Sequence, residues 1–186
     1  MLELGTILKN EPAAKDIYEM VLQVPGIAKK SKPGQFVNLR LSHKLDPLLR
    51  RPISLHGIDP EKGTISMLYL VVGEGTSMMK DMEAGETIDV LGPLGNGWNC
   101  EFEGSHAVLI GGGIGIAPLY PLAETLIKNG KDVELIVGAK NEAYLTDVSS
   151  YEKLGVRVTI TTDDGSAGIK GFVTTALAMP AARNPC

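Results

Sequence analysis

A glycine-rich segment near the middle of the chain could hold a nucleotide. Residues 111–118 read GGGIGIAP and lie between a short aliphatic run and a segment with helical periodicity. Glycines at such a junction let the backbone approach a pyrophosphate, and the free amides of the helix N-terminus favour an anion. Pro118 stands where the G-x-G-x-x-G fingerprint has its third glycine, and no acidic residue follows the next predicted strand. Taken alone, the segment is equally compatible with a turn that lets a strand and a helix pack closely.

Two further motifs in the first half could also bind an anion. Arg51-Pro52-Ile53-Ser54 combines a planar cation suited to phosphate with a hydroxyl that can donate to a polar ring edge. Residues 73–76, GEGT, place glycines just before a predicted helix that Thr76 caps and that ends near Met82. On its own the first motif is more typical of a surface arginine beside an edge-strand proline, and the alternative for the second is an ordinary hairpin turn and cap.

The elements that position these motifs differ between the two halves of the chain. Up to about residue 100, short apolar runs alternate with glycine and proline, which predicts a small antiparallel barrel or sandwich. The six predicted strands are 3–9, 16–24, 36–41, 51–57, 65–72 and 86–91. In the fifth of these strands apolar residues stand at almost every position, so we expect it to be buried on both faces.

After residue 100 the pattern changes to strand, helix, strand. Strands are predicted at 107–110, 133–137 and 156–161, with a weaker helical connection at 145–154. A helix with one apolar face is predicted from the spacing of Leu119, Leu122, Ala123, Leu126 and Ile127, and Asn129-Gly130 supplies its stop. This order is typical of a parallel α/β sheet. We place a domain boundary between residues 100 and 101.

Composition excludes several other classes. The chain has 186 residues, 44% of them hydrophobic and 22% charged, and a net charge of −4, which predicts a globular chain and disfavours nucleic-acid binding. Glycine and proline interrupt the longest apolar stretch, so no membrane span is expected. The first residues lack a secretory signal pattern, and we therefore expect the cytoplasm. His43, His56 and His106 lack metal-binding spacing, so packing or surface roles are expected for them.

Five motifs in this order resemble those of the ferredoxin-reductase-like flavoproteins, and most closely the electron-transfer subunits of class B dihydroorotate dehydrogenases. The motifs are residues 49–54, 68–76, 92–97, 111–118 and 162–166. The resemblance implies a six-stranded antiparallel FAD-binding barrel at 1–100, followed by a parallel α/β pyridine-nucleotide-binding domain at 101–186. It also implies an NAD(P)H-dependent oxidoreductase that needs no catalytic acid or base.

The same resemblance assigns cofactor contacts. Arg51 is expected at the FAD pyrophosphate, Ser54 near the flavin N5, Tyr69 stacked on the flavin or its ribityl chain, and Gly75 with Thr76 around the pyrophosphate. The expected FAD-binding residues are Arg51, Pro52, Ile53, Ser54, Leu68, Tyr69, Leu70, Gly75 and Thr76. The expected NAD(H)-binding residues are Gly112, Gly113 and Gly115, with Asp163 and Asp164 near the ribose or amide.

In this family electrons pass from NADH to FAD, then to a [2Fe–2S] cluster and to FMN in a catalytic subunit that oxidises dihydroorotate in pyrimidine biosynthesis. The two cysteines of this sequence, Cys100 and Cys186, are fewer than the four ligands of such a cluster. The family continues to a cysteine-rich segment, whereas residues 181–186 do not resemble one. We therefore expect a second domain that is C-terminally incomplete, with one sheet edge exposed unless a partner or a second copy covers it.

Two alternatives remain open at this stage. An NADPH:ferredoxin-type reductase subunit would share the fold, and Lys140, near the end of the second predicted strand of the α/β half, could favour a 2′-phosphate. A flavin-binding module without turnover would belong to a different class of protein. Flavin reduction by NADH, by NADPH or by neither separates these readings.

Overall fold

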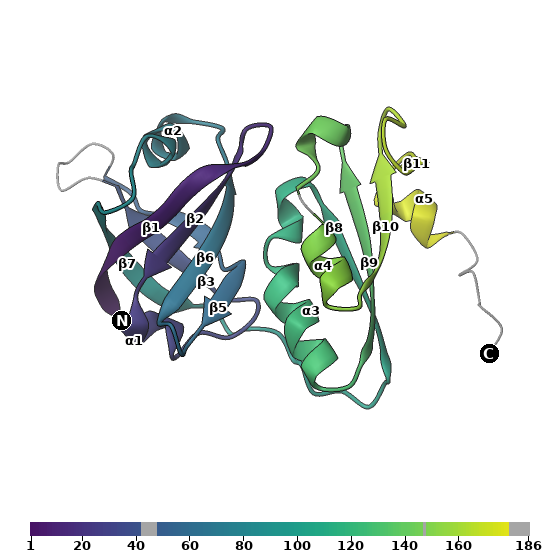
Figure 1. Cartoon of the computed structure of the whole chain (residues 1–186), viewed down its shortest axis with the longest axis horizontal. Helices are drawn as coiled ribbons and strands as arrows, with labels where there is room; N and C mark the ends of the chain where they lie inside the picture. Colours follow the sequence, from purple (N-terminus) through teal and green to yellow (C-terminus); the bar gives the residue numbers. More distant parts are fainter. Residues whose placement is uncertain (42–47, 147, 179–186) are drawn as a thin grey trace.

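The first sheet is antiparallel and curls into a barrel. The computed structural model describes residues 1–41, 48–146 and 148–178, and Figure 1 shows two sheet units side by side. The strands of the first unit are β1 (Leu2–Ala14), β2 (Ile17–Gln23), β3 (Phe36–Arg40), β4 (Arg51–Ser54), β5 (Gly57–Asp59), β6 (Thr64–Leu70) and β7 (Thr87–Leu94). They pair in the order β4-β3-β7-β1-β2-β6-β5.

The prediction of six strands is wrong by one, because the expected strand 51–57 ends at Ser54 and a separate strand, β5, begins at Gly57. Leu55 N–H donates to Gln35, next to β3, whereas His56 N–H donates to Ser66 in β6. Consecutive amides thus bond to opposite ends of the sheet order, and the chain must bend between β4 and β5. This bend brings the two sheet ends together and closes the barrel.

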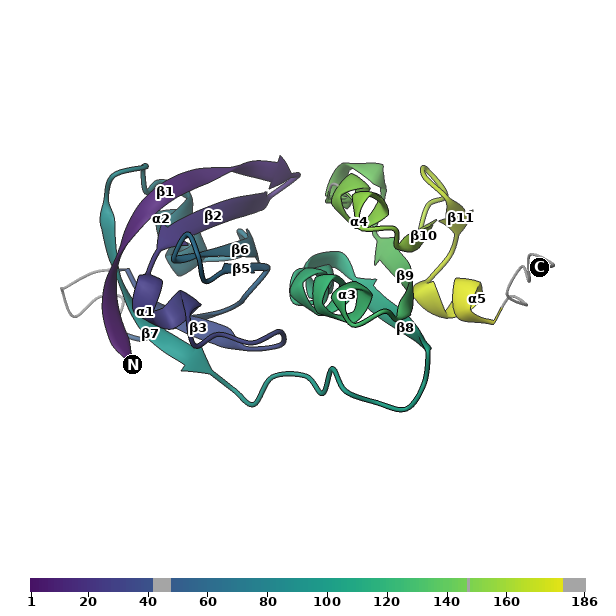
Figure 2. The same ribbon diagram turned by 60° about the horizontal axis from the view of Figure 1, so that its bottom comes forward.

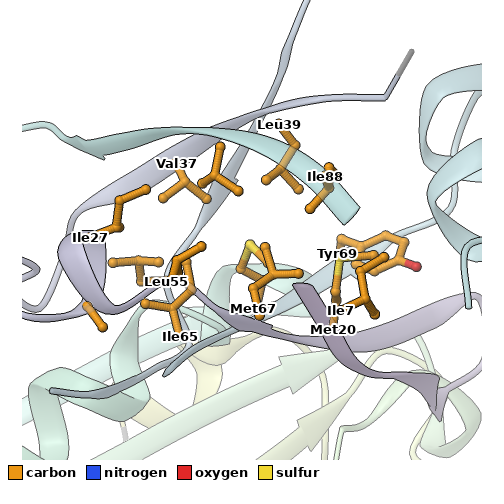
Figure 3. Packing of buried hydrophobic residues seen from close by; sticks show 14 of the residues in the cluster. Ile7, Met20, Ile27, Val37, Leu39, Leu55, Ile65, Met67, Tyr69 and Ile88 are labelled. Carbon is orange, nitrogen blue, oxygen red and sulfur yellow. The ribbon is translucent and has the colours of Figure 1, made fainter. Parts of the chain in front are cut away.

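The barrel core is filled by alternating side chains of the strands. Ile65, Met67 and Tyr69 of β6 all point into it, together with Val37 and Leu39 of β3 (Figure 3). The short helix α1 (Pro25–Ala28), absent from the predictions, closes one end of the core with Ile27 and Ala28. Strand alternation therefore sets which side chains of β6 remain for the outer surface.

The helix predicted from Thr76 begins earlier. Helix α2 spans Glu74–Lys80, and Gly73 is its N-cap. Thr76 is the third helical residue, and its hydroxyl accepts the Gly73 N–H at 3.2 Å and donates to the Gly73 carbonyl at 3.1 Å. The threonine thus shapes the turn from inside the helix, and the predicted cap lies three residues after the observed N-cap, Gly73.

The second sheet is parallel. Its strands are β8 (His106–Gly112), β9 (Asp132–Ala139), β10 (Arg157–Thr162) and β11 (Ile169–Lys170), in the order β11-β10-β9-β8. Three strands were predicted, and the two-residue β11 was missed. The helices are η1 (Gly113–Ile116), α3 (Leu119–Lys128), η2 (Glu142–Tyr144), α4 (Ser149–Lys153) and α5 (Val173–Leu177). Figure 2 shows α3 and α4 on the side of the sheet nearer the barrel and α5 on the other side.

Helix α3 confirms the expected apolar face. All five predicted side chains pack into the second core, and Asn129 ends the helix before Gly130, whose φ is +73°. The predicted helical connection at 145–154 is shorter, since only α4 is helical within it and η2 ends just before it. The boundary between residues 100 and 101 lies in the connection from β7 to β8 and stays a prediction, as does the incompleteness of the second half.

Candidate functional site

A pocket of about 430 Å³ lies between the barrel and the glycine-rich loop. The barrel side brings together two predicted motifs, and the opposite wall comes from the start of the second unit. The lining residues are Arg51, Pro52, Ile53, Ser54, Leu68, Tyr69, Leu70, Val72, Thr76, Ile114, Gly115, Ala117 and Pro118. Chain segments that are far apart in sequence thus form one cavity. The predictions missed the roles of Ile114, Ala117 and Pro118 here, although all three belong to the glycine-rich motif.

Arg51 supplies a positive charge at this pocket. Its guanidinium lies against Gly75 in the first turn of α2, since a Cβ built on that glycine would collide with the guanidinium. Its Nη1 donates to the Leu49 carbonyl at 2.7 Å. Among residues 1–41, 48–146 and 148–178, no ion pair includes Arg51. The charge is therefore placed where an anionic ligand could meet both it and the helix start.

Arg50 has a structural role instead. Its two terminal nitrogens donate to the Asp89 carboxylate at 2.9 and 3.0 Å, and Nη1 also reaches the backbone carbonyls of Asn38 and Asp89. This bidentate pair ties the residue before β4 to β7. Of the two neighbouring arginines, Arg50 therefore stabilises the fold, whereas Arg51 lines the pocket.

The Thr76 hydroxyl already has local partners. Besides its bonds with Gly73 it accepts the Val72 N–H at 3.0 Å. It therefore holds the 72–76 turn in shape. A direct bond from this hydroxyl to a pyrophosphate stays a prediction.

Strand β6 presents its two faces to different environments. Leu68 and Leu70 point away from the barrel core and pack with Ile17, Ile114 and Ala117, so they join the pocket wall to the glycine-rich loop. This apolar cluster connects the two units directly beside the cavity.

Tyr69 lies on the core face of β6. The residue is 1% exposed, its ring stacks on Tyr18 at a centroid distance of 5.9 Å, and its hydroxyl donates to Asn10 at 2.8 Å. Burial raises the pKa of Tyr69 to about 12. The core therefore encloses the ring although the residue lines the pocket, and the expected stacking of Tyr69 on a flavin stays a prediction.

A second cavity, of about 210 Å³, lies at the carboxyl ends of the parallel strands. Its lining residues are Gly112, Gly113, Gly138, Ala139, Thr161, Asp163, Phe172 and Val173. A Cβ at Gly112 or Gly113 would meet no atom within 4 Å, so these glycines leave the cavity floor open. Ligands of open α/β sheets bind at this edge. Thr161, Phe172 and Val173 were missed, although strand ends are a recognisable signal.

The structure separates residues that were expected together. Gly115 opens on the first pocket, whereas Gly112 and Gly113 open on the second cavity. Asp163 lines that cavity, but Asp164 caps a turn by accepting the N–H and hydroxyl of Ser166 at 2.9 and 2.6 Å. These bonds lower the pKa of Asp164. The contact expected between Asp164 and a nucleotide therefore stays a prediction.

Residues 1–41, 48–146 and 148–178 hold no group of three His, Cys, Asp or Glu side chains placed to bind a metal. Cys100 is a free thiol. His43, Cys186 and residues 181–186 lie outside the described residues. In the described part of the chain, no helix is both long and apolar enough to cross a membrane.

Comparisons with solved structures define the class of fold. The structure of an NADH-dependent reduced ferredoxin-NADP oxidoreductase is similar with a TM-score of 0.84 and 36% identity, covering 94% of this chain and 62% of that chain. The cytochrome b5 reductase domain of Ulva prolifera nitrate reductase is similar in fold, with a TM-score of 0.73 and 16% identity over 92% of this chain and 78% of that one. The two sheets and the pocket between them thus form a ferredoxin-reductase-like fold.

Sequence relatives narrow this class. The electron transfer subunit of dihydroorotate dehydrogenase B (NAD(+)) from Geobacillus sp. (strain WCH70) is 41% identical over 174 residues, which are 92% of this chain and 67% of the relative. That from Shouchella clausii (strain KSM-K16) is 43% identical over 171 residues, 91% of this chain and 66% of the relative. No family model matches. The chain belongs to the family of dihydroorotate dehydrogenase B electron transfer subunits and spans about two thirds of the length of these relatives.

Proposed function

We propose that this chain binds FAD and NADH and passes electrons from NADH through FAD. The observation that carries the proposal is the pocket between barrel and glycine-rich loop, with Arg51 against Gly75 at one end and the second cavity beyond the loop. The family to which the chain belongs supports the same function. Bound FAD would supply the chemistry, since it accepts two electrons as one hydride and can release them singly.

The residues of the barrel fit the cofactor. Arg51 would neutralise a pyrophosphate charge, and the absence of a side chain at Gly75 leaves room for the guanidinium against α2. Ser54 lines the pocket and would donate to the flavin edge, while Leu68 and Leu70 form an apolar wall beside it. Gly115 leaves the opposite wall open, because its Cβ would meet no atom within 4 Å.

The second cavity would hold the pyridine nucleotide. Gly112 and Gly113 permit close approach of the backbone to the nucleotide, and Asp163 could accept a ribose hydroxyl. Both cavities border the short stretch from Gly112 to Pro118. This loop would orient the nicotinamide toward the flavin, and such positioning is the protein's main contribution to hydride transfer.

We further propose that the electrons leave toward a [2Fe–2S] centre and an FMN-containing dihydroorotate dehydrogenase catalytic subunit in the cytoplasm. The sequence has two cysteines, so ligands of a four-cysteine cluster would have to come in part from other polypeptide. Among the described residues β8 is an edge strand, and a free strand edge can pair with a second copy of the chain. Sedimentation measures whether the chain self-associates in this way.

The test is flavin reduction in the purified chain. We expect bound FAD, seen as absorption bands at about 380 and 450 nm, and anaerobic bleaching by NADH faster than by NADPH. Faster bleaching by NADPH would favour the ferredoxin-type reductase. The observation that supports this alternative is that Lys140 is exposed beside the second cavity. A chain that retains FAD but is bleached by neither nucleotide would be a flavin-binding module, and a colourless chain with no FAD affinity would refute the proposal.

A further inference from the structure

His56 joins the barrel to the glycine-rich loop. It lies in the bend between β4 and β5, and its Nδ1 is 2.9 Å from the carbonyl oxygen of Ala117, 61 residues further along the chain. Because a carbonyl can only accept, Nδ1 carries the proton and donates. The His56 ring also packs on Tyr120 of α3, with a centroid distance of 5.3 Å. His56 lines neither the FAD pocket nor the second cavity.

The neighbouring carbonyl of the loop is held from the other side. Tyr151 of α4 is 1% exposed and donates its hydroxyl to the Ile116 carbonyl at 3.1 Å. The Tyr151 ring meets Tyr120 edge-on at a centroid distance of 5.1 Å. Two consecutive carbonyls are thus fixed by side chains from different units, and Tyr120 contacts both of the residues that hold them.

The glycines of the loop make few packing contacts with either unit. A Cβ at Gly113 or Gly115 would meet no atom within 4 Å, so these residues offer nothing for packing against either unit. Ile114 and Ala117 supply apolar contacts to Leu68 and Leu70. Apolar contacts allow sliding, whereas a hydrogen bond fixes direction and distance.

We propose that His56 is a positioning residue that sets the place of the loop 113–118 relative to the barrel, and hence of the nicotinamide relative to the flavin. The inference rests on the proposed function for its catalytic consequence, but not for the contact itself. A displacement of about 1 Å in a hydride-transfer geometry can cost about a hundredfold in rate.

A second contact between the units provides a control. At the β1–β2 hairpin, Lys15 N–H donates to the Ala143 carbonyl at 2.9 Å, and the Tyr144 hydroxyl lies 3.5 Å from an Asp16 carboxylate oxygen. This contact is exposed and involves η2 rather than the glycine-rich loop. Tyr144→Phe therefore weakens a link between the units without touching the loop.

Two variants separate the donor from the ring. His56→Phe keeps an aromatic ring against Tyr120 and removes the donor, whereas His56→Asn removes the ring and keeps an N–H donor at a similar distance from the backbone. Amide hydrogen exchange of residues 113–117, measured by mass spectrometry, reads the loop whether or not a flavin is bound. We expect exchange about tenfold faster in His56→Phe, and near wild type in His56→Asn and Tyr144→Phe.

Flavin reduction supplies the second readout. In His56→Phe we expect unchanged FAD absorption and a reduction rate by saturating NADH that falls at least about tenfold, with recovery in His56→Asn. If His56→Phe shows the exchange and reduction rates of the wild type, the positioning role of His56 is refuted and the proposed function is not. The same holds if His56→Phe and His56→Asn lose exchange protection and reduction rate equally. Loss of FAD from the wild-type chain would instead refute the proposed function, and the exchange data would still report on the contact.

Discussion

The guanidinium of Arg51 lies against the backbone of Gly75, where any side chain would displace it. Two motifs that are each unremarkable in sequence therefore form one cationic corner of the pocket. The contact couples β4 to the first turn of α2, and it defines where an anion would meet both a guanidinium and free helical amides.

Gly75→Ala should weaken FAD binding by about tenfold or more, because the new Cβ would push the guanidinium off the helix start. Fluorescence titration with FAD measures the change. Arg51→Ala supplies the second arm of a double-mutant cycle. If the methyl group acts through Arg51, the double variant should bind FAD no more weakly than Arg51→Ala alone, whereas additive losses would show an independent effect of Gly75.

Substitutions of the two neighbouring arginines should affect different properties, FAD affinity for Arg51 and the free energy of unfolding for Arg50. Arg51→Ala removes a charge-assisted contact and should weaken FAD binding by about 1.5 to 3 kcal/mol, with little change in urea stability. Arg50→Ala leaves the Asp89 carboxylate without its bidentate partner and should lower the free energy of unfolding by about 1 to 3 kcal/mol. Equal effects of both variants on FAD affinity would contradict the division of roles.

Tyr69→Phe should affect stability rather than flavin binding. The variant loses the hydroxyl bond to Asn10, which also donates to the carbonyls of Met79 and Met82 at the end of α2. We expect a loss of about 1 kcal/mol in the free energy of unfolding and an unchanged FAD spectrum. A shifted flavin absorption band in this variant would mean that the hydroxyl reaches the cofactor after all.

The stability of the chain should fall in mild acid partly through His56. Burial lowers the pKa of His56 from its ordinary value of 6.5, while the Ala117 bond and the nearby Glu19 oppose this shift. Above pH 6.5 the histidine is neutral in the folded and the unfolded chain, so it adds no pH dependence. Below that pH the unfolded chain binds the proton more readily, and stability declines until the folded pKa is passed.

Urea midpoints between about pH 7.5 and pH 5 measure this decline. The part of this decline that is due to His56 is the difference in urea midpoint between wild type and His56→Asn at each pH. Both chains share the other ionisable groups that face His56, including Glu19 on β2 and the Tyr120 hydroxyl on α3. Parallel pH curves for the two chains would show that His56 does not titrate in this range.

The fold was largely predictable because its signals are local. Alternation in β6, the apolar face of α3 and the glycines between β8 and α3 are all determined by neighbours within a few residues. The errors in strand number arose at the bend after Ser54 and at the two-residue β11, where pairing with distant strands, rather than local pattern, decides the structure.

By itself, the sequence determined which motifs exist, which residues can carry charge or permit close backbone approach, and the order of barrel and parallel sheet. Only the tertiary structure decided that Tyr69 faces the core while Leu68 faces the loop, since apolar residues on both faces of β6 hide its orientation. It likewise decided that Arg50 forms an ion pair with Asp89, that Arg51 forms none within the described residues, and that His56 meets Ala117. These outcomes depend on contacts between residues far apart in the chain, which no local spacing encodes.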